Sequence, residues 1–128
     1  MRVLVVQDNR DLGAIWCRFL GRQGVEAELA TNEIEAIEAL AKHSFDALIL
    51  EPVLGGGGGL SIADLAAYRQ PDLPIIAVTK SEFFSDGTIF SIIPNARGFL
   101  RTPVRPEDLA AYIEHCTARK VPERQKSA

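Results

Sequence analysis

Apolar residues in this chain fall into two alternating patterns: short continuous runs, and longer stretches with helical spacing. Continuous runs rich in Val, Ile and Leu are typical of strands buried on both faces of a parallel sheet. They predict strands at residues 2–6, 47–50 and 75–79, with a brief further strand at 98–101. Residues 25–30 alternate apolar and acidic side chains instead, which predicts a half-exposed edge strand.

The stretches between these runs have apolar residues three or four positions apart, which is the spacing of a helix with one face against a core. Helices are predicted from Leu12 to a stop at Gly24, after a cap at Thr31 or Asn32, from about Leu60 to before Pro71, and from Pro106 in a first turn. Their apolar positions are Leu12, Ile15, Trp16, Phe19 and Leu20; Ile34, Ile37, Leu40 and Ala41; Ile62, Leu65 and Ala66; and Leu109, Tyr112, Ile113 and Cys116.

Residues 80–95 have the weakest pattern. Gly87 and Pro94 bracket an apolar group, which predicts a short or irregular helix. That region carries the densest apolar side chains outside the strands, Phe83, Phe84, Ile89, Phe90, Ile92 and Ile93. Part of this set is expected in the core, and the remainder is expected to form an exposed patch for a partner.

Strands and helices alternate five times, which predicts an α/β fold: a doubly wound parallel sheet with helices on both faces, in three layers. The 128 residues are predicted to form one domain over residues 1–120, followed by a polar tail at 121–128.

Composition excludes several classes of protein. The net charge of −3 gives no reason to expect a nucleic-acid or membrane surface, and no apolar run is long enough to cross a bilayer. The N-terminus lacks the pattern of a secretory signal, so a cytoplasmic location is predicted. Cys17 and Cys116 lie far apart and are interpreted as thiols rather than a disulfide. His43 and His115 fall late in predicted helices and are expected to face solvent.

Polar residues follow the predicted strands where each one ends. They are Gln7, Asp8, Glu51, Thr79 and Thr102. In open α/β sheets the working crevice lies beyond the carboxyl ends of the strands, so these side chains are expected to converge there.

The chain resembles response regulator receiver domains, the CheY-like family, from Val3 to about Thr117. The segments that carry the resemblance are 5–9, 45–51, 73–79 and 96–103, together with the spacing between Asp8, Glu51, Thr79 and Thr102. The resemblance implies a flavodoxin-like (βα)5 fold with strand order 2-1-3-4-5. It also implies a site in which acids after the first strand and an aspartate after the third hold Mg²⁺, and that aspartate takes a phosphoryl group from a histidine kinase.

Several positions match the family pattern residue by residue. Asp8 corresponds to the second acid and Thr79 to the hydroxyl that binds a phosphoryl oxygen. Phe99 corresponds to the switch aromatic, and Pro103 to a proline that is typically cis. Three positions depart from the pattern: Gln7 replaces the first acid, Glu51 the phosphoacceptor, and Thr102 the lysine.

These departures predict a site that does not accept phosphate in the ordinary way. Glu51 has one more methylene than aspartate, which moves its carboxylate by roughly 1–1.5 Å, and a displacement near 1 Å costs about a hundredfold in rate. Thr102 has no ammonium group to stabilise a phosphoryl group. Asp8, Glu51 and a carbonyl near Val53 would be the ligands of a Mg²⁺ ion, for which weak or absent binding is expected, so no cofactor is assigned.

The preferred interpretation is an atypical receiver domain that works as a phosphorylation-independent protein-interaction module and not as an enzyme. The resemblance implies a partner face made of the fourth helix, fifth strand and fifth helix, with a histidine kinase, another signalling protein or a second copy as the partner. Two alternatives stay open: a phosphotransfer receiver that accepts phosphate at an unusual residue, and a flavodoxin-like ligand-binding protein.

Gly55 to Gly59 form the one low-complexity segment. No Gly-Lys-Ser/Thr follows them, so they are interpreted as a flexible loop rather than a phosphate-binding loop. Five glycines make the loop costly to order, and it is expected to become fixed when a partner binds.

Overall fold

The chain folds around one sheet of five parallel strands. The structure, a computed structural model, describes residues 1–80 and 86–118. The strands are β1 (Arg2–Val6), β2 (Glu26–Ala30), β3 (Ala47–Leu50), β4 (Ile75–Thr79) and β5 (Ala96–Arg101), in the spatial order β2-β1-β3-β4-β5. Every neighbouring pair is parallel, which confirms the predicted sheet and its strand order.

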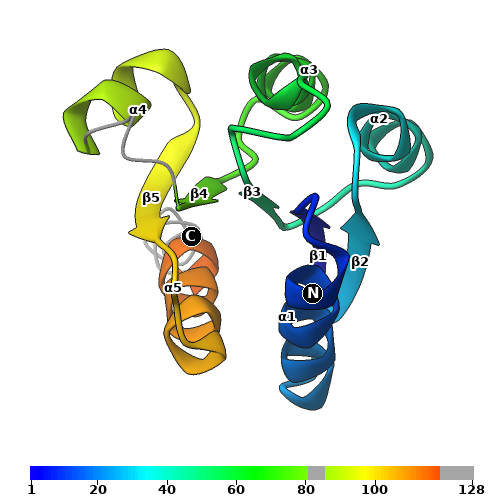
Figure 1. The fold of residues 1–128 in the computed structure, drawn as a ribbon, viewed down its shortest axis with the longest axis vertical. Helices are drawn as coiled ribbons and strands as arrows, with labels where there is room; N and C mark the ends of the chain where they lie inside the picture. Colours follow the sequence, from blue (N-terminus) through cyan, green and yellow to red (C-terminus); the bar gives the residue numbers. More distant parts are fainter. Residues whose placement is uncertain (81–85, 119–128) are drawn as a thin grey trace, which may run out of the picture.

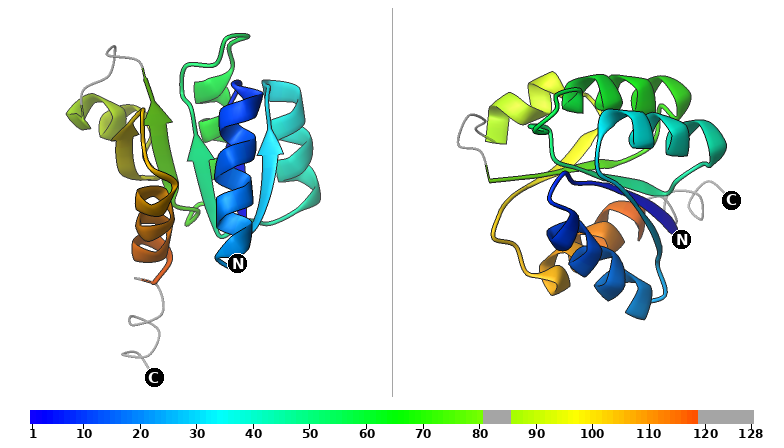
Figure 2. Two further views of the ribbon diagram at one scale, coloured as in Figure 1. Left: turned by 60° about the horizontal axis from the view of Figure 1, so that its bottom comes forward. Right: turned by 45° about the vertical axis from the view of Figure 1, so that its right-hand side comes forward.

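Helices cover both faces of the sheet. They are α1 (Arg10–Arg22), α2 (Glu33–Lys42), α3 (Gly59–Arg69), α4 (Asp86–Ile92) and α5 (Pro106–Ala118). Helices α1 and α5 lie on one face and α2, α3 and α4 on the other (Figure 1 and Figure 2). The three-layer architecture is therefore as predicted.

The core has two halves because successive strand residues point to opposite faces of the sheet. One half joins Val3, Val5, Ile49 and Ile76 of the strands to Trp16, Leu20, Leu109 and Ile113 of α1 and α5. The other joins Leu4, Val6, Leu48 and Ile75 to Leu40, Ile62 and Ile89 of the opposite helices. Burial on both faces explains why the strands read as continuous apolar runs.

Side-chain caps place α1 earlier than its predicted start and select one of the two predicted caps of α2. Helix α1 begins before Leu12 because the Leu12 backbone N–H donates to Oδ1 of Asn9 at 3.1 Å. Asn32, rather than Thr31, caps α2, where it accepts from the Glu35 N–H at 2.9 Å. Strand β5 begins at Ala96, earlier than predicted, because Ala96 already pairs with Ile75 of β4.

The predicted core face of α2 is wrong at three of its four positions, and Leu40 is buried as predicted. Ile34 is 69% exposed, Ile37 is 40% exposed and Ala41 is exposed as well. Besides Leu40, the helix buries Ala36 and Ala39, whose small side chains allow it to lie close to β1, β2 and α3. Helix α2 therefore carries two apolar stripes, and the stripe with the smaller side chains is the one that packs against the core. On α1, Ile15 is likewise 48% exposed.

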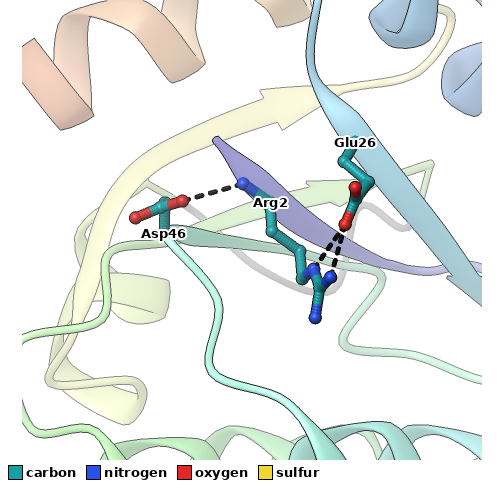
Figure 3. Close-up of polar contacts among 3 residues, drawn as sticks. All are labelled: Arg2, Glu26 and Asp46. Atoms are coloured by element: carbon teal, nitrogen blue, oxygen red, sulfur yellow. Dashed lines mark hydrogen bonds and ion pairs between the residues drawn. The ribbon is translucent and has the colours of Figure 1, made fainter.

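Arg2 ties the start of β1 to both of its neighbours (Figure 3). Its guanidinium donates to Oε2 of Glu26 at 2.6 Å, and its backbone N–H donates to Oδ2 of Asp46 at 2.8 Å. Both side chains of the ion pair are partly exposed, so the pair contributes about 0–1 kcal/mol. Its main effect is to set the register of the N-terminal strand.

Other predictions can be compared with the described residues. Both histidines are exposed, and both cysteines are thiols, with burial raising the pKa of Cys17 to about 11. Within residues 1–80 and 86–118, no helix combines the length and apolar character of a membrane span. In α4 and just after it, Ile89 and Ile93 are buried, whereas Phe90 and Ile92 are partly exposed; Phe83 and Phe84 lie outside the described residues.

The two apolar stripes of α2 predict opposite responses to truncation. Leu40→Ala removes a side chain that is 5% exposed and should lower the free energy of unfolding by about 2–5 kcal/mol. Ile34→Ala should change it by no more than about 0.5 kcal/mol. Urea denaturation at low protein concentration measures both. Similar losses in the two variants would contradict the orientation of α2.

Candidate functional site

A cavity of about 500 Å³ lies beyond the carboxyl ends of the strands. Its lining residues are Gln7, Asp8, Asn9, Leu12, Glu51, Val53, Gly55, Lys80 and Thr102. The turns after β1, β3, β4 and β5 supply all of them except Leu12, which belongs to the first turn of α1. The sequence-predicted residues Gln7, Asp8, Glu51, Val53 and Thr102 are thus brought together, as expected for an open parallel sheet.

Glu51 is buried at the floor of this site, with 5% of its surface exposed. Its Oε2 accepts a hydrogen bond from the Val53 backbone N–H at 3.0 Å. The Thr79 hydroxyl and the Lys80 backbone N–H also donate to this carboxylate. Thr79 is fully buried at the end of β4 and points at the carboxylate from the neighbouring strand. Three donors from two strand ends therefore hold Glu51 in place.

The environment raises the pKa of the Glu51 carboxyl. Burial is the largest influence and raises the pKa of the carboxyl above its ordinary value of 4.5. The hydrogen bonds from Thr79, Val53 and Lys80 oppose this shift, and the negative charge of Asp8 adds to it. The three donors therefore offset only part of the cost of burying the charge.

Asp8 and Gln7 are both occupied by contacts within the chain. Oδ2 of Asp8 accepts from the Gly55 backbone N–H at 2.7 Å, which joins the end of β1 to the glycine run. The Gln7 side chain is buried, and its Oε1 accepts from the Asn9 N–H at 3.0 Å. A glutamine can accept this hydrogen bond from the Asn9 N–H without adding a third negative charge beside Asp8 and Glu51.

Hydrogen bonds and backbone angles define the path of the glycine run. Besides the Gly55 bond to Asp8, the Gly57 N–H donates to the Leu54 carbonyl at 2.9 Å. Gly57 and Gly58 have φ values of +86° and +92°, where other residues are strained. At Gly59, the first residue of α3, a Cβ would collide with the backbone carbonyl of Pro52. Gly56 alone has neither constraint.

The remaining predicted residues lie beside the cavity or outside it. The Thr102 side chain lines the cavity, and its backbone N–H donates to the Thr79 carbonyl at 3.0 Å. Phe99 is half-buried, with the Arg101 guanidinium 5.2 Å from its ring centre. The Thr102–Pro103 peptide bond is cis, and Pro103 lines a separate groove.

Lys80 is the residue of this cavity that sequence reasoning missed. It directly follows Thr79, its backbone N–H binds Glu51, and it is exposed at the cavity. Lys80 could have been found in the sequence because it immediately follows Thr79, a hydroxyl residue at a strand end. It brings one positive charge to a cavity that has two carboxylates and, at Thr102, no ammonium group.

The residues present do not fit a divalent cation well. No group of three or more His, Cys, Asp or Glu side chains in the described ranges is arranged to hold one. Asp8 and Glu51 are the carboxylates available, and backbone N–H groups already donate to both. A hard cation takes about six oxygen ligands, so backbone carbonyls or waters would have to supply most of them.

The fold and the arrangement of strand-end residues are shared with a known family. Residues 3–114 match the family described as "Response regulator receiver domain". The chain belongs to this family. The matched residues span most of the described chain.

The curated relatives are named as response regulators. Response regulator MprA of Mycobacterium leprae is 30% identical over 123 residues, which are 96% of this chain and 54% of the relative. The MprA protein of Mycobacterium avium has the same identity and coverage. The chain therefore spans about half the length of the curated relatives it matches.

Solved structures show the same fold at lower identity. A two-component response regulator from Clostridium difficile has a TM-score of 0.83 and 23% identity, over 94% of this chain and 98% of that one. A CheY-like receiver domain protein from Methanospirillum hungatei has a TM-score of 0.81 and 24% identity, over 99% and 98% of the two chains. These likenesses support the flavodoxin-like topology.

The glycine run predicts a contrast between two alanine substitutions. Gly59→Ala should lower the free energy of unfolding by about 1–3 kcal/mol, because the added methyl group meets the Pro52 carbonyl. Gly56→Ala is the matched control and should be neutral or stabilising by up to about 1 kcal/mol, since its Cβ meets nothing within 4 Å. Thermal or urea unfolding of both variants measures the difference. Equal effects would show that the loop does not hold this path.

Burial of Glu51 predicts that its contribution to the free energy of unfolding depends on pH. Because its folded-state pKa lies above the ordinary value of 4.5, the folded state holds the proton more tightly than the unfolded state. The stability of wild type relative to Glu51→Gln should be greatest below pH 4.5 and fall as the pH rises through the folded-state pKa. Urea denaturation at a series of pH values measures this. A difference that grows with pH would contradict the raised pKa.

Proposed function

We propose that this receiver domain acts as a phosphorylation-independent module for protein interaction in a two-component-type signalling system. The observation that carries the proposal is the state of Glu51. Its carboxylate is buried and accepts hydrogen bonds from the Val53 N–H, the Thr79 hydroxyl and the Lys80 N–H.

These contacts oppose phosphorylation in two ways. A carboxylate must present a free, charged oxygen in line with the phosphoryl donor. The donors around Glu51 already hydrogen-bond to its carboxylate, and burial raises the pKa of the group. In addition, Thr102 brings no cation to the charge that develops during transfer.

The same contacts hold the site in one state. In the proposed arrangement, the Thr79 hydroxyl is directed at Glu51 permanently, with no phosphoryl group needed to turn it toward the site. A carboxylate carries about one negative charge where a phosphoryl group carries nearly two. Glu51 therefore substitutes for the hydrogen-bonding role of a phosphoryl group better than for its charge.

Magnesium is not required on this proposal. Asp8 is used to hold Gly55, and Glu51 is used to hold Val53 and Thr79. The site is thereby closed by contacts within the chain, and binding of Mg²⁺ is weak or absent.

The partner of the module is a signalling protein, such as a histidine kinase, or a second copy, and it contacts the face formed by α4, β5 and α5. Phe90 and Ile92 leave apolar surface exposed there, at 43% and 38%. Arg97 and Arg101 are exposed on β5. Such a module belongs in the cytoplasm with the kinases of these systems.

Intact mass after incubation with acetyl phosphate and Mg²⁺ tests the proposal. The wild-type chain should not gain the mass of a phosphoryl group, for the reasons of geometry and charge given above. A variant with Gln7→Asp, Glu51→Asp and Thr102→Lys should gain it and serves as the positive control. A gain in wild type that Glu51→Gln abolishes would overturn the proposal in favour of a receiver that accepts phosphate on glutamate.

A further inference from the structure

Helix α2 presents an apolar stripe to solvent. Ile34, Ile37 and Ala41 lie three and four residues apart and therefore share one face of the helix. Ile34 is 69% exposed and Ile37 is 40% exposed. The exposed Glu38 lies beside the stripe, one turn from Ile34, and α2 also carries Glu33 and Glu35. Lys42 is the basic residue of its last turn, so the helix is negative overall. This stripe and its acidic neighbours are called the α2 outer face.

A groove of about 850 Å³ lies between β5, the turn after it, and α5. Leu100, Val104 and Tyr112 give it an apolar floor, and all three are half-buried against the core. Arg101, Arg105 and His115 stand at its rim, together with Asp108, to which Arg105 donates at 3.1 Å. The rim is positive overall. This surface is called the β5–α5 groove.

The two surfaces are complementary in chemistry. Each has an apolar centre, and the charges around the centres have opposite signs. They also match in length: Ile34 to Ala41 and Asp108 to His115 each span seven helical steps, or about 10 Å. A helix that places its apolar stripe in an apolar groove is a common mode of recognition.

Within one molecule the two surfaces cannot meet. Helix α2 packs over β1 and β2 at one edge of the sheet, whereas β5 is the opposite edge strand. Helix α5 also lies on the other face of the sheet (Figure 1). Contact between them therefore requires two copies of the chain.

We propose that the α2 outer face of one copy docks into the β5–α5 groove of another. This contact is heterologous, with different surfaces on the two copies, and so it leaves one free groove and one free α2 outer face on each dimer. Such a contact continues into a ring or an open chain of subunits. It gives the receiver domain a head-to-tail assembly that does not depend on the state of Glu51.

The C-terminal tail is a poorer occupant of the groove. Residues 119–128 contain four basic side chains and one acidic side chain, the same sign of charge as the groove rim. The acidic α2 outer face has the sign that the groove requires.

Mass measurement by light scattering or sedimentation over a range of concentrations tests the proposal with the full chain. Wild type should rise from the monomer mass of 14.0 kDa to at least twice that value, and high ionic strength should shift it back. Ile34→Lys blocks the α2 outer face, and Ala111→Glu blocks the groove at an exposed lining residue. Each variant alone should remain a monomer.

An equal mixture of these two variants is the decisive sample. The intact α2 outer face of the Ala111→Glu chain fits the intact groove of the Ile34→Lys chain, so the mixture should form a dimer and nothing larger. This result also shows that both variants are folded. Ile15→Lys changes an equally apolar side chain, 48% exposed on α1, and should associate like wild type.

Several results would overturn the proposal. They are a wild type that stays monomeric at every concentration, a blocked variant that still associates, and a mixture that does not form dimers. Loss of association on changing Arg124→Glu and Lys126→Glu in the full chain would assign the contact to the tail instead. Phosphoryl transfer to Glu51 is measured separately, so this proposal and the proposed function fail independently.

Discussion

The Glu51 carboxylate is the constraint around which the site is built. A carboxylate buried at the end of a strand is costly unless hydrogen bonds satisfy it. The Val53 N–H, the Thr79 hydroxyl and the Lys80 N–H supply those bonds from the ends of two neighbouring strands. This arrangement holds the turn after β3 against the end of β4.

Charge explains how the surrounding residues tolerate this carboxylate. The family pattern of three acids and one lysine leaves two negative charges, and Asp8 with Glu51 leaves the same number because Gln7 and Thr102 are both neutral. Lys80 then adds a positive charge at the cavity. Asp8 has the neutral Gln7 beside it, and its carboxylate accepts a hydrogen bond from the Gly55 backbone N–H, which holds the start of the glycine run. With both carboxylates ionised, the altered residues together with Lys80 therefore leave one net negative charge at the cavity.

Helix α2 shows why a correct periodicity can still assign the wrong face. Two apolar stripes run along this helix, one of isoleucine and one of alanine with Leu40. Hydrophobicity alone favours the larger side chains for the core. The strands and α3 approach too closely for them, so alanine is buried and isoleucine is exposed. The surface left outside is the one that a second copy can cover.

The sequence by itself determined the order of the elements, the doubly buried strands and the set of residues at their carboxyl ends. These follow from local patterns, since a strand buried on both faces must be apolar throughout and a parallel sheet brings its strand ends together. Tertiary structure alone decided the rest. Asp8 and Gly55 are 47 residues apart, and no local pattern pairs them. The donors to Glu51, the inward stripe of α2 and the entry of Lys80 into the cavity likewise depend on how separate segments pack, which spacing along the chain does not encode.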